Sequence, residues 1–274
     1  MIKNNNLQIE NFLNFDNFIP FKAEWDKAQP FSHITLENFL KNNLLENIVN
    51  EFPDFNDDCW KIYNSPLETK KLTNHWDNFK SNTYALFQYL NSREFISSLE
   101  ILTECDLFPD FGLNGGGLHT HKLGGHLNVH MDYSIHPKLK LQRKLNLIIY
   151  ITPNWKKEWG GQLGLWAHNK DKNAPDDLIK SIYPNFNSAV LFDTTQNSWH
   201  GLPEPIRCPE GITRNSLAIY YLCKPNEGAT NRGKALFAPY KNQANDTKIL
   251  ELIKKRSETE FASGVYGNKA NQEK

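Results

Sequence analysis

Two histidines and one aspartate form the pattern in this chain that is best suited to chemistry. His130 and Asp132 are separated by one residue, and alternate residues of an extended strand point to the same face, so both side chains can reach one ion. His200 follows residues 188–193, an apolar run typical of a buried strand, and is the natural third ligand. Two histidines and one carboxylate make the facial triad that suits non-haem Fe(II).

Two alternatives stay open for these three residues. The same side chains could bind zinc, or they could be three unrelated polar groups, since a His-x-Asp pair alone is a weak pattern. Iron is preferred because a facial triad leaves open positions for a chelating cosubstrate and oxygen.

The elements that must position this triad are predicted to be mostly strands. Four apolar runs lack long helices between them, which favours an all-β barrel or sandwich: residues 145–151, 162–167, 189–192 and 217–222. Leu118 to Asp132 predicts a β-hairpin that turns at Gly124-Gly125 and carries the ligand pair at the end of its second arm.

Helical spacing of apolar residues appears on both sides of these strands. Thr35–Leu40 and Leu44–Phe52 predict an amphipathic helix that ends at Pro53, residues 59–64 predict a short strand, and a polar loop is expected after it to about His75. Further predictions are two helices between 82 and 102 that divide at Asn91-Ser92, and a helix from Asp246 to Lys255 followed by a mobile polar tail.

The ordered set of motifs resembles a known enzyme family. His130-x-Asp132, then His200, then Arg214 opening an apolar strand resemble the 2-oxoglutarate- and Fe(II)-dependent dioxygenases, in particular the prolyl-4-hydroxylase-like branch. Residues 143–152 followed by Trp-Gly-Gly-Gln-Leu at 159–163 resemble the family's segment between the two ligand sites. The resemblance covers about residues 80 to 225.

The resemblance implies a mainly β fold with flanking helices (α+β), built on a double-stranded β-helix, or jelly-roll, core. We expect a single domain over 1–274: an N-terminal extension with a helix at 1–80, the dioxygenase core at 81–225, and a C-terminal helix with a mobile tail at 226–274. The implied catalytic metal ligands are His130, Asp132 and His200.

The resemblance also implies cosubstrate contacts. A guanidinium fits a carboxylate as a fork, so Arg214 is expected to hold the far carboxylate of 2-oxoglutarate, with Arg207 as a rival. Asn128, on the same strand face as His130, and Tyr150 are further expected contacts, whereas Arg143 is assigned to structure or substrate.

The expected activity is hydroxylation of an unidentified amino acid, peptide or protein side chain, or other small molecule, with Fe(II), 2-oxoglutarate and O2, yielding succinate and CO2. Ascorbate is a further expected reductant. Aspartate at position 132 favours hydroxylation over halogenation, which in related halogenases accompanies a small residue at this place. The alternative is a non-catalytic or cupin-like module. His119-x-His121 supplies half of a cupin pattern, and a glutamate at the expected distance is missing.

Composition limits the partners. The chain has 31 basic and 31 acidic residues, which gives no global field for nucleic acid or an anionic membrane. No signal peptide or apolar span is evident, so a cytoplasmic location is expected. Four scattered cysteines argue against a zinc site or a disulfide framework. A small-molecule or peptide substrate is the expected partner, and the oligomeric state is left open.

Overall fold

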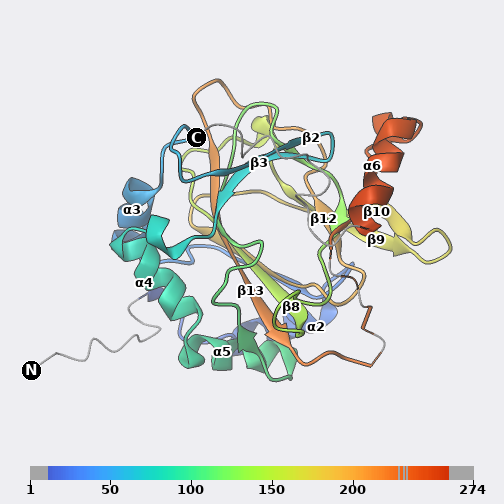
Figure 1. Cartoon of the computed structure of the whole chain (residues 1–274). Coiled ribbons are helices and arrows are strands. Elements are labelled where there is room, and N and C mark those ends of the chain that lie inside the picture. The colour runs from blue at the N-terminus through green and yellow to red at the C-terminus, as the bar shows by residue number, and fades with distance from the viewer. Residues whose placement is uncertain (1–11, 228, 231, 233, 259–274) are drawn as a thin grey trace, which may run out of the picture.

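Two antiparallel sheets face each other in the computed structural model, which describes residues 12–227, 229–230, 232 and 234–258 (Figure 1). The larger sheet runs in the order β1-β11-β8-β13-β5-β3-β2, with β4 beside β13 and β6 beside β3. Its strands are β1 His33–Leu36, β2 Lys61–Ser65, β3 Glu68–Thr73, β4 Phe108–Pro109, β5 Gly117–His121, β6 His126–Leu127, β8 Gln142–Tyr150, β11 Ser188–Asp193 and β13 Arg214–Cys223.

The smaller sheet has the order β10-β9-β12-β7-β14. Its strands are β7 His130–Met131, β9 Leu163–Asn169, β10 Ala174–Ile182, β12 Trp199–Gly201 and β14 Leu236–Phe237. This arrangement confirms the predicted jelly-roll core with flanking helices. Three strands before residue 81 and one after residue 225 join the sheets, so the sheets draw on more of the chain than residues 81–225.

Strand β13 shows how alternation separates the core from the cavity between the sheets. Leu217, Ile219 and Tyr221 pack into the main hydrophobic cluster on the outer face, while Ser216 and Ala218 line the cavity on the inner face. Successive side chains of a strand point to opposite faces, so one strand serves both layers.

Helices cover the outer face of the larger sheet (Figure 1). They are α2 Lys22–Lys27, α3 Asn42–Glu51, α4 Ser81–Leu90 and α5 Arg93–Thr103, while α6 Thr247–Glu258 lies beside β14. The predicted division near Asn91-Ser92 is confirmed, because the Ser92 hydroxyl accepts a hydrogen bond from Phe95 N at 3.2 Å and caps α5. Asp246 caps α6 in the same way, accepting from Lys248 N at 2.9 Å.

Three local predictions were wrong. Thr35–Leu40 does not continue the helix: residues 33–36 form β1, which pairs with β11, because a short apolar run is ambiguous between helix and strand. The polar stretch before His75 contains β3. The predicted hairpin of Leu118 to Asp132 is absent, since β5 pairs with β13 in the larger sheet and β7 with β12 in the smaller one.

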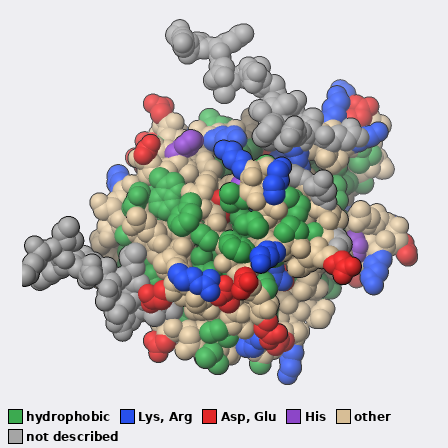
Figure 2. All heavy atoms as spheres, turned by 60° about the horizontal axis from the view of Figure 1, so that its bottom comes forward, with side chains coloured by type: hydrophobic (Ala, Val, Ile, Leu, Met, Phe, Trp, Pro, Cys, Tyr) green, Lys and Arg blue, Asp and Glu red, His purple; other side chains and the backbone are tan. Residues whose placement is uncertain are grey.

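The outer surface carries acidic and basic side chains side by side on the face seen in Figure 2, in keeping with the balanced composition. The four cysteines are unpaired. Among the described helices, none has both the length and the apolar character needed to cross a bilayer. The tail predicted to be mobile lies outside the described residues.

Candidate metal and cosubstrate site

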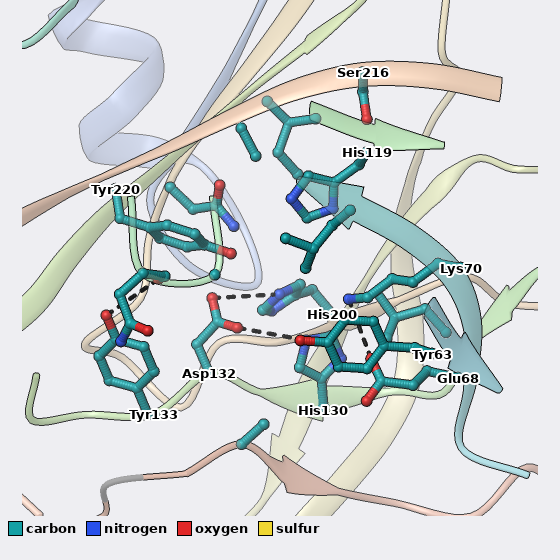
Figure 3. A pocket seen from close by; sticks show the side chains of 18 of the residues that line it. Tyr63, Glu68, Lys70, His119, His130, Asp132, Tyr133, His200, Ser216 and Tyr220 are labelled. Carbon is teal, nitrogen blue, oxygen red and sulfur yellow. Dashed lines mark hydrogen bonds and ion pairs between the residues drawn. The ribbon is translucent and has the colours of Figure 1, made fainter. Parts of the chain in front are cut away.

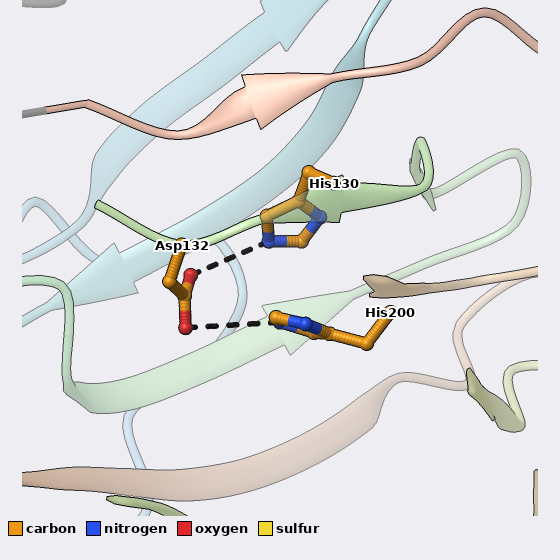
Figure 4. Close-up of side chains that lie close together, drawn as sticks. All are labelled: His130, Asp132 and His200. Atoms are coloured by element: carbon orange, nitrogen blue, oxygen red, sulfur yellow. Dashed lines mark ion pairs between the residues drawn. The ribbon is translucent and has the colours of Figure 1, made fainter. Parts of the chain in front are cut away.

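The three predicted ligands meet at one place because β7 and β12 are neighbours in the smaller sheet. His200 is the direct cross-strand partner of His130, and Asp132 follows β7 by one residue. The exposed fraction is 3% for His200, 6% for His130 and 7% for Asp132. One donor atom from each lies within 4.8 Å of the others, and Figure 4 shows the two imidazoles and the carboxylate pointing to a common centre.

Hydrogen bonds fix which nitrogen of each imidazole faces that centre. The Nδ1 atoms of His130 and His200 lie 2.9 and 2.8 Å from the carbonyl oxygens of Asn128 and Ser198. A carbonyl oxygen can only accept, so each Nδ1 carries the proton and each Nε2 presents a lone pair. The Nε2 atoms lie 3.5 and 3.7 Å from the Asp132 carboxylate, which is too long for good hydrogen bonds and suits an ion held between them.

The Asp132 carboxylate is kept ionised by its surroundings. Burial alone would raise the pKa of Asp132, but the charge of Arg143, together with His200 and His130, lowers this pKa well below its ordinary value. Asp132 Oδ2 is buried without a hydrogen-bond partner among the described residues. Two lone-pair nitrogens and one anionic oxygen therefore fit a divalent metal ion, and no described residue occupies the space that the ion would fill.

Arg143 is part of this centre, although sequence reasoning assigned it only to structure or substrate. Its guanidinium lies 3.3 Å from Asp132 Oδ2 and donates to the Asn114 carbonyl at 2.6 Å. The rings of Tyr133 and Tyr220 lie on either side of it, with centroids 3.5 and 3.4 Å away. Such stacking fixes the planar group, so Arg143 holds the Asp132 carboxylate in place.

A cavity of about 370 Å³ opens between the triad and the inner face of the larger sheet, and Arg214 lies in its wall. Arg214 is 4% exposed, its Nε donates to the Gly161 carbonyl at 2.7 Å, and its guanidinium lies 4.9 Å from the centroid of the Tyr150 ring. Burial lowers the pKa of Arg214, and Tyr150 opposes that shift. A buried cation held this way can receive a carboxylate.

Gly161 allows Arg214 to take this position. A Cβ at residue 161 would lie 3.0 Å from Arg214 Cδ and 3.2 Å from Trp155 Cζ2, and the φ angle of Gly161 is +75°. We expect Gly161→Ala to lower the free energy of unfolding by about 1–2 kcal/mol, because a side chain is strained at this φ. It should also weaken 2-oxoglutarate binding several-fold by displacing Arg214. Urea unfolding and a 2-oxoglutarate titration measure the two effects, and Gly211→Ala, which has a similar φ of +80° but open space around it, is the control.

Tyr150, a predicted cosubstrate contact, lies beside Arg214, whereas Asn128 and the rival anchor Arg207 are not among the residues that line the cavity. The Asn128 side chain donates to Gln243 Oε1 at 2.7 Å and to the Ala238 carbonyl at 3.2 Å, so it faces the C-terminal segment and not the cavity. Asn128 instead serves His130 through its main-chain carbonyl. Arg207, the rival of Arg214, lies at the surface with its side chain 57% exposed and forms two hydrogen bonds with Glu204.

Sequence reasoning missed the residues that form the cavity's outer part. Figure 3 shows Tyr63, Glu68 and Lys70, from β2 and β3, on one side of the triad, with Tyr133 and Tyr220 on the other. Glu68 pairs with Lys70 at 3.2 Å and with Arg256 of α6 at 2.9 Å. Glu68 and Lys70 carried no sequence signal, because the residues of β3 lack the apolar alternation that identifies a strand, whereas Tyr63 lay in the predicted strand of residues 59–64 without an assigned role. The segment 232–240, which had no assigned role, supplies Lys234, Ala235 and Phe237 to the cavity wall.

Two further histidines of β5 also line the cavity. Burial, reinforced by the charge of Lys70, lowers the pKa of His119 to about 3. Burial also lowers the pKa of His121 well below its ordinary value, with Arg214 and Lys70 adding to the shift. Both side chains are therefore neutral at physiological pH. By contrast, His126 lies at the sheet edge, with Nε2 3.1 Å from the Ser65 carbonyl.

The low pKa of His119 predicts acid-sensitive stability. Its folded pKa of about 3 lies below the ordinary value of 6.5, so between these values the unfolded chain binds a proton that the folded chain does not. Stability is therefore complete above the ordinary pKa and falls as pH drops toward 3. We expect His119→Phe to reduce this slope by up to about 1.4 kcal/mol per pH unit, as measured by urea unfolding at several pH values. His75→Phe at an exposed position is the control, and an unchanged slope in His119→Phe would contradict the prediction.

Residues 116–222 match the family model of the 2OG-Fe(II) oxygenase superfamily. Prolyl 3-hydroxylase OGFOD1 of Xenopus laevis is 36% identical over 79 residues, covering 29% of this chain and 15% of the relative. The same enzyme of Mus musculus is 24% identical over 194 residues, covering 70% of this chain and 33% of the relative. The chain thus spans a third or less of these curated relatives.

Solved structures share the fold. A Pseudomonas putida prolyl-4-hydroxylase has a TM-score of 0.51 at 14% identity, covering 75% of this chain and 99% of that one. A prolyl 4-hydroxylase of Phytophthora capsici has a TM-score of 0.50 at 18% identity, covering 86% and 72%. At these identities the similarity concerns the fold alone.

Proposed function

We propose that the chain is a 2-oxoglutarate-dependent hydroxylase of the 2OG-Fe(II) oxygenase superfamily, in its prolyl-4-hydroxylase-like branch, and the match of residues 116–222 to that family's model and the similarity to prolyl 3-hydroxylases support this. The observation that carries the proposal is the convergence of two Nε2 lone pairs and one carboxylate at a cavity whose wall holds a buried arginine. A metal-binding module without catalysis has no need for that arginine.

Each group has a separate task in the proposed reaction. His130, Asp132 and His200 hold Fe(II), and Arg214, beside Tyr150, receives the far carboxylate of 2-oxoglutarate. Bound Fe(II) supplies the oxygen chemistry that hydroxylates the substrate, with succinate and CO2 as the other products. Arg143 fixes the Asp132 carboxylate, and the buried walls exclude water from the reacting atoms.

Prolyl side chains are the first substrate class to test. Both curated relatives are named as prolyl 3-hydroxylases, although the chain covers only a part of their length. A peptidyl proline would need access from the β2–β3 side, where Tyr63 and Lys61 form the outer wall. A cytoplasmic site of action and a need for ascorbate are parts of the same proposal.

The test is an anaerobic titration of purified protein with Fe(II) and then 2-oxoglutarate, because chelation of Fe(II) by a 2-oxo acid gives a visible charge-transfer band. We expect a band that saturates at one equivalent of each. The same titration with Zn(II), which is d¹⁰ and has no such band, is the control. If folded, Fe(II)-loaded protein gives no band, the hydroxylase assignment fails and the cupin-like binding module takes its place.

A further inference from the structure

A row of polar side chains crosses the inner face of the larger sheet, starting at Arg214. Arg214 of β13 is the cross-strand partner of His121 of β5. Leu72 lies opposite His119, which brings Lys70 of β3 opposite His121, and Lys70 is in turn paired with Tyr63 of β2. The row therefore starts at Arg214, its inner end, and continues through His121 and Lys70. It ends at Tyr63 on β2, which forms the edge of the sheet.

The middle of this row is built for a ligand. His121 is 3% exposed, lines the cavity, and neither of its ring nitrogens has a hydrogen-bond partner among the described residues. A buried polar group without a partner costs on the order of 1–3 kcal/mol, so such groups in a cavity wall mark a place where a ligand completes the hydrogen bonds. The neutral imidazole has one N–H to donate.

The charges around His121 select the sign of that ligand. Arg214 lies on one side and Lys70 on the other, and both depress the pKa values of His119 and His121, as expected in a region of positive potential. Lys61 adds a further basic side chain at the outer end of the cavity, with its ammonium 5.1 Å from the Tyr63 ring centroid. Glu68 pairs with Lys70 but also with Arg256, so it is shared between two cations.

The row is long enough for two anions. Adjacent strands lie about 4.8 Å apart, so Arg214 and Lys70, two strands apart, are separated by roughly 10 Å at the backbone. The far carboxylate of 2-oxoglutarate, which is proposed to bind Arg214, occupies only the inner end of the row. The geometry points to a second carboxylate subsite at Lys70 and His121, which binds an acidic group of the substrate next to the hydroxylated position.

This inference rests on the proposed function, because it assigns Arg214 to the cosubstrate. The probes are synthetic peptides of one length with a central proline flanked by Glu, Gln or Lys, together with free glutamate and glutamine as small-molecule counterparts. Each is titrated anaerobically into the Fe(II)–2-oxoglutarate complex and followed by the change in the charge-transfer band and by quenching of tryptophan fluorescence. Succinate formation in air is a second readout.

We expect the wild-type protein to bind the carboxylate probes at least about tenfold more tightly than their amide counterparts, and the Lys-flanked peptide most weakly. Lys70→Met and His121→Leu should remove this preference while leaving the 2-oxoglutarate titration unchanged. Lys172→Met, at an exposed position, is the matched control.

Two results would overturn the inference. If no carboxylate probe binds the wild-type complex better than its amide counterpart, the subsite does not exist. If Lys70→Met or His121→Leu weakens 2-oxoglutarate itself and leaves the probe preference intact, the whole row belongs to the cosubstrate. In either case the wild-type charge-transfer band tests the hydroxylase assignment separately.

Discussion

His130→Ala should abolish the Fe(II)–2-oxoglutarate charge-transfer band and lower turnover by at least about 10³-fold. The variant removes one of the two proposed nitrogen ligands, and a metal site of this kind contributes several kcal/mol of transition-state stabilisation, each 1.4 kcal/mol of which is tenfold in rate. The loss should appear both in the anaerobic titration and in metal content after gel filtration.

The control for this prediction is His126→Ala, which lies four residues earlier at the edge of the larger sheet, outside the triad. It should keep the band and the bound metal. Circular dichroism of both variants shows whether they fold. A folded His130→Ala protein that retains full turnover would show that another residue holds the metal.

Arg214→Leu should raise the dissociation constant of 2-oxoglutarate by about 10²-fold with Fe(II) affinity unchanged. Truncating one member of a buried, hydrogen-bonded charge pair costs about 2–5 kcal/mol, and Arg214 is both buried and oriented by Gly161. Arg214→Lys should lose less, because it keeps the charge but not the forked geometry. The measurement is the 2-oxoglutarate dependence of the charge-transfer band.

Arg207→Leu is the matched control, since Arg207 was the rival anchor in sequence and lies at the surface with Glu204. Its 2-oxoglutarate affinity should equal that of the wild type. The reverse pattern, with Arg207→Leu impaired and Arg214→Leu normal, would reassign the anchor.

The meeting of His130, Asp132 and His200 beside Arg214 at one cavity could be predicted because the signals are local in sequence. His130 and Asp132 share a strand face by simple alternation, and β13 begins at Arg214 and continues as a strongly apolar run. The strands themselves predicted an all-β barrel or sandwich, and the resemblance to the dioxygenases specified the jelly roll. Arg143 was harder to assign, because its role depends on Tyr133, Tyr220 and Asp132 meeting around it.

The outer part of the cavity could not be predicted, for a physical reason. Strand β3 is Glu-Thr-Lys-Lys-Leu-Thr, in which Glu68 and Lys70 face the cavity and Lys71 contacts Phe55 on the other face, so neither face shows the apolar pattern of a core strand. The path after β5 was misjudged because Gly124-Gly125 resembles a hairpin turn, whereas the chain continues into β6, which pairs with β3, and reaches the smaller sheet at β7. The prediction for Asn128 assumed a regular strand in which residues 128 and 130 share one face. Strand β7 is only two residues long and begins at His130, so this alternation does not extend to Asn128.

The contacts around β7 have a consequence for how the protein matures. The Phe237 ring stacks on the His130 ring with centroids 5.1 Å apart, Asn128 bonds to Gln243, and Arg256 reaches Glu68. These residues are far apart in the chain and can meet only after most of it has left the ribosome, since translation proceeds from the N-terminus. A nascent chain therefore carries both His130 and Asp132 for a long time before their enclosure is complete. We therefore expect the enclosure of the triad to be completed only after β14 and α6 have been synthesised.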